Sequence, residues 1–306
     1  PAMTDPVRLA AMRILARLAS AAYIANPALF PLVVFRMIRL SVRHGNTGAS
    51  SYGYAVYGII LCGVLGDIDG AYVPFAPADA AGFAALVAAG RAGLIMGLNV
   101  TAPFKEQAFA LADTATAAAR LTSSANILTF DDGRVSADSS DGIGLMRGLK
   151  EQAPDLDVAG RPVVMLGAGG AARAGSGALV KAGAEVRIVN RSPERAQALA
   201  ADLGPSVRVM AAPDAFDGAA LVVNALSVSP DIDFDRIAPG TVVMDMTYKP
   251  LATPLLTAAR ARGLPTVDGL AMLIGQAAPS FQALFRRPPP SLDLRALLLA
   301  LLGATV

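Results

Sequence analysis

One stretch of the sequence has the residue types that a dinucleotide-binding turn requires. Gly167, Gly169, Gly170 and Ala171 directly follow an apolar run at residues 162–166, and a predicted helix comes next. The first glycine permits a tight turn, the second lets the backbone approach a pyrophosphate, and the helix N-terminus then meets the anion. A glycine-rich turn without a ligand is the alternative, but the flanking strand and helix favour dinucleotide binding.

The end of the next predicted strand indicates which dinucleotide would bind. An NAD enzyme places a carboxylate at this strand tip, where it binds the ribose 2′-hydroxyl. Here residues 185–189 are followed instead by Asn190, Arg191, Ser192 and, further on, Arg195. Guanidinium groups bind phosphate through charge-assisted, bidentate hydrogen bonds, so these residues predict NADP. In the alternative interpretation the two arginines are ordinary surface charges and Ser192 caps the following helix.

A lysine at the end of another predicted strand has a position suited to proton transfer. Within residues 99–105 a strand ends in polar residues and the chain turns into a helix near Lys105. A lysine so placed can donate or accept a proton if a carboxylate orients it. The alternative is an ordinary lysine in a first helical turn.

The composition excludes several other kinds of site. His44 and Cys62 are the single histidine and the single cysteine, so no His/Cys metal cage or disulfide can form and no metal is predicted. With 16% charged residues and a net charge of +2, the chain is too weakly charged to grip a nucleic acid. The lone cysteine and the lack of a signal-type opening favour a cytoplasmic protein.

These residues need a framework of alternating strands and helices to position them. A chain of 306 residues is long enough for two domains. The predicted strands are residues 72–75, 93–100, 162–166, 185–189, 221–224 and 241–244, and the predicted helices are 78–89, 105–118, 144–152, 174–182 and 276–303, the last broken at prolines 288–290. This alternation predicts an α/β fold with a parallel-sheet domain and a Rossmann-type NADP-binding domain.

The first 70 residues differ in character from the rest. Two or three helices are expected, interrupted near Pro27 and Pro31. Three arginines follow at helical spacing, namely Arg36, Arg39 and Arg43. We interpret them as a solvated helix face rather than as a stripe that faces lipid or a partner. Residues 49–66 carry no charge, but they include two serines and four glycines and are at the short limit for a membrane span. A buried core segment is the preferred interpretation.

Several ordered motifs across residues 71–306 resemble the shikimate dehydrogenase family. Residues 99–105 match its Asn-Val-Thr-x-Pro-x-Lys signature, and residues 138–142 are similar to its Asp-Asn-Thr-Asp-Gly motif. The other similar segments are residues 124–128, the glycine turn, and residues 190–192, 224–227, 245–250 and 268–276.

The resemblance implies reversible, NADP-dependent reduction of 3-dehydroshikimate to shikimate. It makes Lys105 and Asp141 the acid–base pair, and it gives the substrate-binding residues as Thr101, Asn126, Tyr248 and Gln276. The residues flanking the nicotinamide would be Ala225, Met246, Gly269 and Met272, although a core role for Met272 is equally consistent with the sequence.

The resemblance also implies an organisation of the chain. It predicts a substrate domain at 71–141 plus 275–306 and an NADP-binding domain at 142–274, and it leaves residues 1–70 as an atypical, mainly helical segment outside the resemblance. The expected partner is a small-molecule substrate, with no nucleic acid and no membrane, in a monomer or homodimer.

The sequence departs from the family at one substrate-binding motif. The family's Gly-x-Pro-x-x-His-Ser-x-Ser-Pro motif, whose serines bind the substrate carboxylate, has no counterpart before residue 72. Residues 54–58 imitate only its preceding strand, and Ser139 and Leu226 replace a family Asn and Thr. The alternative function is therefore an NADP-binding relative that acts on another hydroxy acid or lacks turnover. A third hypothesis makes residues 5–70 a helical or membrane-associated interaction module.

Overall fold

The computed structural model describes residues 2–25, 30–44 and 75–302. The chain divides into two compact units, Pro1–Ala78 and Asp79–Val306, and each is described by itself. The uncharged run at residues 49–66, the strand candidates at 54–58 and 72–74, and Cys62 lie outside the described residues.

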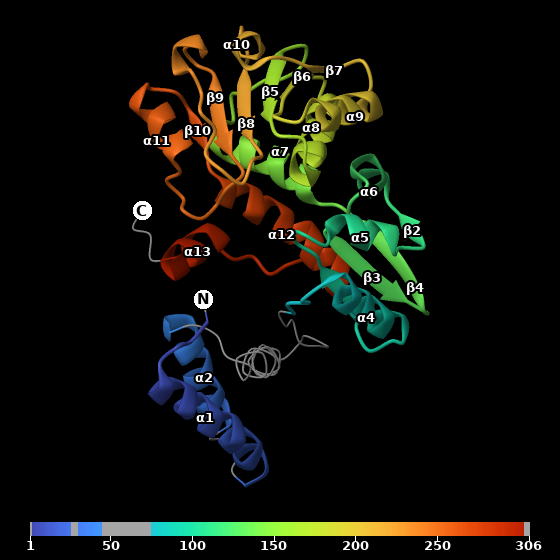
Figure 1. Cartoon of the computed structure of the whole chain (residues 1–306), viewed down its shortest axis with the longest axis vertical. Helices are drawn as coiled ribbons and strands as arrows, with labels where there is room; N and C mark the ends of the chain where they lie inside the picture. Colours follow the sequence, from blue (N-terminus) through green and yellow to red (C-terminus); the bar gives the residue numbers. More distant parts are fainter. Residues whose placement is uncertain (1, 26–29, 45–74, 303–306) are drawn as a thin grey trace. The chain divides into compact units, whose positions relative to one another are not determined.

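The first unit contains two helices, α1 (Pro6–Ala25) and α2 (Phe30–His44) (Figure 1). Met12 and Met37 are fully buried between them, and the Arg8 guanidinium contacts the His44 ring, with 2.9 Å between Nη1 and Nδ1. The predicted helices are thus confirmed. The arginines Arg36, Arg39 and Arg43 are exposed, as expected for a solvated face. Among the helices that the structure describes, none is long and apolar enough to cross a membrane.

The second unit is built on a six-stranded sheet in which every neighbouring pair of strands is parallel. The strands, in sheet order, are β10 (Thr266–Val267), β9 (Val242–Asp245), β8 (Leu221–Asn224), β5 (Pro162–Leu166), β6 (Glu185–Val189) and β7 (Val207–Val209). This order is that of the doubly wound dinucleotide-binding fold. The predicted α/β class is therefore confirmed.

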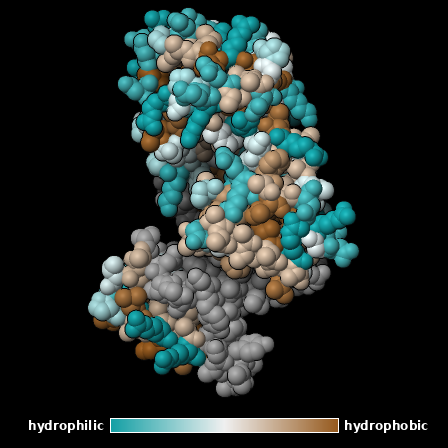
Figure 2. All heavy atoms as spheres, turned by 45° about the vertical axis from the view of Figure 1, so that its right-hand side comes forward, coloured by the Kyte–Doolittle hydropathy of each residue, from teal (hydrophilic) through white to brown (hydrophobic). Residues whose placement is uncertain are grey.

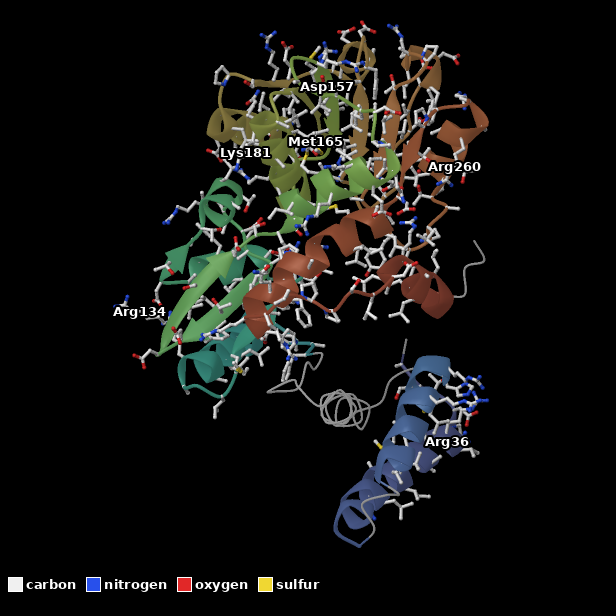
Figure 3. The ribbon with its side chains drawn as sticks, turned by 180° about the vertical axis from the view of Figure 1, so that it is seen from behind. Arg36, Arg134, Asp157, Met165, Lys181 and Arg260 are labelled. Carbon is white, nitrogen blue, oxygen red and sulfur yellow. The ribbon has the colours of Figure 1, made fainter. Side chains whose placement is uncertain are left out.

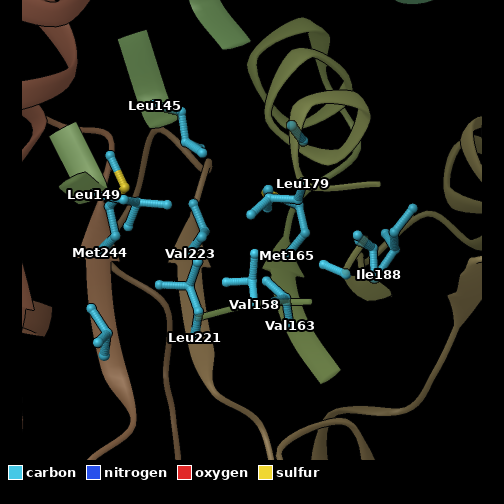
Figure 4. Packing of buried hydrophobic residues seen from close by; sticks show 14 of the residues in the cluster. Leu145, Leu149, Val158, Val163, Met165, Leu179, Ile188, Leu221, Val223 and Met244 are labelled. Carbon is cyan, nitrogen blue, oxygen red and sulfur yellow. The ribbon is translucent and has the colours of Figure 1, made fainter. Parts of the chain in front are cut away.

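Helices cover both faces of this sheet, because successive strand residues point to opposite sides. The helices of this unit that pack on it or run beside it are α7 (Asp141–Gln152), α8 (Gly170–Lys181), α9 (Pro193–Leu203), α10 (Ala212–Ala215), α11 (Pro254–Ala261) and α12 (Gly269–Phe285). Val163 and Met165 of β5 pack in one core cluster with α7, α8 and α9 (Figure 4). Val164 and Leu166 point to the other face and pack in a second cluster with α10 and α11.

Charged side chains surround this core. Asp157, Lys181 and Arg260, labelled in Figure 3, are exposed, whereas Met165, labelled in the same view, is fully buried. Figure 2 shows the same distribution from outside, with hydrophilic residues interspersed among smaller apolar areas.

A smaller, four-stranded sheet precedes the large one in the chain and corrects one expectation. Its order is β1 (Gly97–Asn99), β3 (Ile127–Asp131), β4 (Arg134–Asp138) and β2 (Thr114–Ala115). Only β2 and β4 pair in parallel, so the parallel pairing expected for this domain is wrong within the described residues. The reason is a tight hairpin: Asp132 and Gly133 both have positive φ, which suits a two-residue turn between antiparallel strands.

The prediction of one helix at residues 105–118 is also wrong, because the structure has two helices in this region. These are α5 (Lys105–Ala110) and α6 (Ala117–Thr122), separated by β2. Between them, the Asp113 carboxylate accepts hydrogen bonds from Arg91 and from the Val135 amide, which places the chain against β4. These bonds hold the pKa of Asp113 below its usual range. The Thr116 hydroxyl then caps α6.

The strand expected at residues 93–100 is shorter than predicted. The preceding helix α4 (Ala80–Arg91) ends in a turn through Gly93, whose φ of +79° suits glycine. Only Gly97–Asn99 therefore remain as strand β1.

Helix α12 begins earlier than expected, at Gly269 rather than residue 276. It contacts α7 and also β1 and β3, so it connects the large sheet to the small one (Figure 1). Glycines allow α7 and α12 to approach closely: a Cβ on Gly144 would stand 2.6 Å from the Met272 carbonyl oxygen. After the prolines at 288–290, the last helix of the described residues is α13 (Leu294–Leu302), which confirms the expected break.

We expect Gly144→Ala to destabilise the protein by about 1–3 kcal/mol, because the added methyl group would overlap backbone that cannot shift independently. Helix propensity alone predicts the opposite sign, a stabilisation of about 1 kcal/mol. Urea unfolding of the variant measures the sign, and Ile143→Ala at the exposed neighbouring position is the control. A variant more stable than the parent would contradict the packing argument.

Candidate active site

Lys105 and Asp141 meet although 36 residues separate them. Lys105 begins α5 and Asp141 begins α7, and the Lys105 ammonium donates a hydrogen bond of 2.6 Å to Asp141 Oδ2. The Asp141 side chain is 3% exposed and that of Lys105 is 23% exposed, so solvent reaches the lysine but hardly the carboxylate. This arrangement orients a partly accessible ammonium, as a proton donor requires.

The segment that carries Lys105 is held in place by packing. The ring of Phe104, the preceding residue, stacks on Phe83 of α4 with 5.0 Å between ring centroids. The Lys105 carbonyl accepts a hydrogen bond of 2.9 Å from the Ala125 amide. Both contacts restrict the first turn of α5, so the lysine side chain starts from a fixed backbone.

Asn126 and Gln276 join this pair. The Asn126 side-chain amide lies 3.1 Å from Asp141 Oδ1 and 3.1 Å from Gln276 Oε1. Asn126 is buried on the loop before β3, and Gln276 lies on α12. Four sequence-predicted residues from four elements or loops therefore form one cluster, which we call the lysine–carboxylate cluster: Lys105, Asp141, Asn126 and Gln276.

Two serines support the cluster, and the sequence analysis did not single them out. The Ser140 hydroxyl lies 3.0 Å from Asn126 Nδ2 and 3.1 Å from the hydroxyl of Ser280, and both serines are buried. A signal for Ser280 was present, since it follows Gln276 by four residues and so lies on the same face of α12. Beside them, Ser139 has a buried hydroxyl without a hydrogen-bond partner among the described residues.

Two other residues predicted to bind substrate do not join the cluster. Thr101 is exposed on the loop before α5, and Tyr248, 45% exposed, lies on the loop after β9. Within residues 75–302 no hydrogen bond links either side chain to the cluster. Their proposed contacts thus depend on the substrate itself.

The glycine turn lies at the carboxyl edge of the large sheet. Gly167 has a φ of +113°, and no protein atom lies within 4 Å of a Cβ built on Gly169, so the space above this residue is open. Helix α8 starts at Gly170 and directs its free amides toward that space. The Ala225 amide, from the loop after β8, bonds to the Leu166 carbonyl at 2.9 Å. The turn therefore sits where the strand order reverses, the usual place for a dinucleotide in this fold.

A buried polar pair shapes the neighbouring loops. Asn224 ends β8 and Asp245 ends β9, and the asparagine amide donates to the aspartate at 3.1 Å. Asn224 Oδ1 accepts the Leu226 amide, and Asp245 Oδ1 accepts the Thr247 amide. These bonds fix the loops that carry Ala225 and Met246.

The two remaining residues of the predicted nicotinamide site lie at the start of α12. A Cβ on Gly269 would stand 2.5 Å from the Met246 carbonyl oxygen, so only glycine fits this crossing. Met272 is 6% exposed and packs in the core cluster, which fits the alternative role that the sequence left open.

The residues predicted to bind the 2′-phosphate lie at the tip of β6. Arg191 and Arg195 are exposed, and the Asn190 amide bonds to the Ser192 carbonyl at 2.9 Å. Ser192 occupies the cap position of α9, but its side chain makes no capping hydrogen bond. The hydroxyl is thus not committed to the helix, contrary to the alternative in which Ser192 serves as the cap.

A doubly wound sheet with an open glycine turn, a second sheet, and a lysine–carboxylate pair at the starts of α5 and α7 define a two-domain, dinucleotide-dependent oxidoreductase. The chain is 48% identical over 248 residues to a shikimate dehydrogenase (NADP(+)) of Caulobacter vibrioides, covering 77% of this chain and 87% of the relative. It is 43% identical over 245 residues to one of Cereibacter sphaeroides, covering 76% and 88%. The chain therefore belongs to the shikimate dehydrogenase family.

Family models and solved structures agree with this assignment. Residues 65–128 match the shikimate dehydrogenase substrate binding domain, and residues 162–234 match a model described as NADP oxidoreductase, coenzyme F420-dependent. A Thermus thermophilus shikimate 5-dehydrogenase, solved in complex with NADP(H) and shikimate, is 30% identical with a TM-score of 0.64 and covers 78% of this chain and 88% of that one.

Proposed function

We propose that this protein catalyses the reversible, NADP-dependent reduction of 3-dehydroshikimate to shikimate. The observation that carries the proposal is the 2.6 Å pair between Lys105 and Asp141, joined by the side-chain amides of Asn126 and Gln276. The two relatives, both shikimate dehydrogenases (NADP(+)), supply the substrate class.

The chain's own residues would handle the proton and the hydroxyl groups. NADPH, held by the glycine turn and residues 190–195, would supply a hydride for the ketone carbon. The Lys105 ammonium donates its proton to the ketone oxygen as negative charge develops there, which yields the alcohol and a neutral amine. Asp141 holds the ammonium in position and is left to accept a hydrogen bond from a substrate hydroxyl. In the oxidative direction the same amine takes the hydroxyl proton.

The neutral side chains near the pair suit a polyhydroxylated substrate. The Asn126 amide and the Gln276 amide each combine donors with an acceptor, so they can bind hydroxyl groups without adding charge. We propose Thr101 and Tyr248 as further contacts that the substrate would recruit, since both are exposed.

Purified protein with shikimate and NADP should reduce the cofactor at a rate that depends on both concentrations. The absorbance of the reduced nicotinamide measures this directly. Turnover with another hydroxy acid only, or with none, would overturn the proposed substrate.

A second candidate function is an NADP-binding relative without shikimate turnover. The serine motif that binds the substrate carboxylate in the family has no counterpart before residue 72. A substrate carboxylate buried without a hydrogen-bond partner reduces the binding free energy by about 1–3 kcal/mol, which weakens binding roughly tenfold or more. Calorimetry separates the two functions, because this candidate binds NADP but releases no heat with shikimate.

We expect Arg191→Asp to shift the cofactor preference from NADP toward NAD. The substitution removes a phosphate partner and places a carboxylate where it repels the 2′-phosphate and accepts a bond from a ribose hydroxyl. The ratio of kcat/KM for NADP and NAD should fall by about tenfold or more, on the scale of one lost charge-assisted bond. Arg161→Asp, an exposed change just before β5 and hence at the opposite edge of the sheet, is the control. An unchanged ratio would refute the role of Arg191.

A further inference from the structure

A carboxylate outside the active site joins three helices. Asp268 caps α12, since its Oδ1 accepts the Ala271 amide at 2.9 Å. Gln152, the last residue of α7, donates to Asp268 Oδ2 at 3.1 Å and accepts the Asp268 backbone amide at 2.9 Å. Arg295, on α13, contacts both oxygens of the same carboxylate. We call these residues the α12 latch: Asp268, Gln152 and Arg295.

The latch is largely shielded from water. The Asp268 side chain is 10% exposed and that of Arg295 is 31% exposed, and Arg295 also lies 3.3 Å from Glu151. Burial raises the pKa of Asp268, but the hydrogen bonds from Arg295, the Ala271 amide and Gln152 outweigh it and hold the pKa below its usual range. The carboxylate is therefore ionised and engaged at neutral pH, and it needs its cation.

Two of the three helices that meet at the latch, α7 and α12, carry residues of the lysine–carboxylate cluster. Helix α7 begins at Asp141 and ends at Gln152, and α12 carries Met272 one turn after its cap and Gln276 one turn further on. Gly269, next to the cap, packs against the loop that carries Met246 with no room for a side chain. A shift of the first turn of α12 would hence move Met272 and the Met246 loop.

We infer that Arg295 is a positioning residue for the reaction. Its ion pair with Asp268 holds the first turn of α12 against α7, and this contact determines the positions of Met272 and Gln276. The expected effect of Arg295 on kcat rests on the proposed function, whereas its effect on the first turn of α12 does not. Arginine suits the task because its planar guanidinium engages both carboxylate oxygens at once.

Kinetics of Arg295→Met test the inference, because methionine keeps an apolar stem but lacks the guanidinium. We expect kcat with shikimate and NADP to fall about tenfold, since small misplacements near reacting groups cost rate steeply. The affinity for NADP should fall less than kcat, because the glycine turn and residues 190–195, which we propose to bind the phosphates, lie outside α12. Arg295→Lys should recover part of the loss. Arg286→Met is the matched control, because it breaks an ion pair with Asp131 at the other end of α12.

Amide hydrogen exchange measures the local stability of α12 in the same variant and needs no substrate. Amides of residues 269–272 should exchange about tenfold faster in Arg295→Met, whereas peptides from residues 278–285 should not change. If the parent protein turns over no shikimate, the proposed function fails but this local readout still decides the inference. Any of three results would overturn the inference. The first is unchanged exchange at residues 269–272 in Arg295→Met, and the second is equal acceleration of exchange throughout the second unit. The third is an unchanged kcat for Arg295→Met when the parent protein is active with shikimate.

Discussion

Lys105→Ala is expected to lower kcat by about 10²–10⁴, the range for loss of a positioned general acid or base. The Lys105 ammonium is the group that Asp141 orients at 2.6 Å, and within the described residues no other lysine or arginine makes an ion pair with that carboxylate. The affinity for NADP should change little, because the glycine turn that we propose as the cofactor site lies on a different loop. Steady-state kinetics and cofactor titration separate the two effects.

Lys150→Ala provides the control, since Lys150 lies exposed in the last turn of α7. Removal of Lys105 leaves the Asp141 carboxylate, 3% exposed, without its cation, and some loss of stability will accompany the loss of rate. Retained NADP binding shows that the variant is folded. Turnover within a few fold of the parent would eliminate Lys105 as the proton donor.

Asp141→Asn is expected to lower kcat by roughly 10²-fold, on the scale of general acid–base contributions, with nearly unchanged side-chain volume. The amide cannot neutralise the ammonium and brings a donor toward the Asn126 amide, which now donates to Asp141 Oδ1 at 3.1 Å. The lysine would lose its fixed orientation. The measurement is kcat across pH, with the exposed Asp155→Asn as the control.

The double variant Lys105→Ala/Asp141→Asn sharpens this test. If the two groups act as a unit, their effects are strongly non-additive and the double variant should be about as slow as Lys105→Ala alone. Losses that multiply would mean that Asp141 works independently of the lysine.

The local pattern of the sequence predicted four of the six strands of the large sheet, but not the short edge strands β7 and β10. Strands β5, β6 and β8 begin and end where expected, because buried parallel strands are short apolar runs bounded by turn residues. The glycine turn was visible for the same reason: Gly167 needs its positive φ, and the helix begins three residues later. These features depend on neighbours in the sequence.

The small sheet was harder to predict, because distant contacts decide it. The break between α5 and α6 depends on hydrogen bonds from Arg91 and Val135 to Asp113. Both donors lie outside residues 105–118, so the local sequence does not indicate the break. The hairpin at Asp132 and Gly133 did carry a local signal, since Asp-Gly favours such turns, and it was overlooked. The domain boundaries proposed from the resemblance remain predictions.

The lysine–carboxylate cluster illustrates both kinds of information. Neither the spacing of Lys105 and Asp141 nor their residue types showed that they meet; the resemblance implied it and the structure places them together. Ser140 and Ser280 escaped notice because buried hydroxyl groups resemble ordinary small core residues in a sequence. Their part becomes visible only when α12 is placed beside α7.

The most direct test of the account follows a hydrogen atom. NADPH carrying deuterium at both positions of nicotinamide carbon 4 is mixed with 3-dehydroshikimate and the protein, and the product is analysed by mass spectrometry. The account predicts shikimate with one deuterium, bound to the carbon that was the ketone. Absence of product, or shikimate formed without deuterium, would contradict hydride transfer at this site.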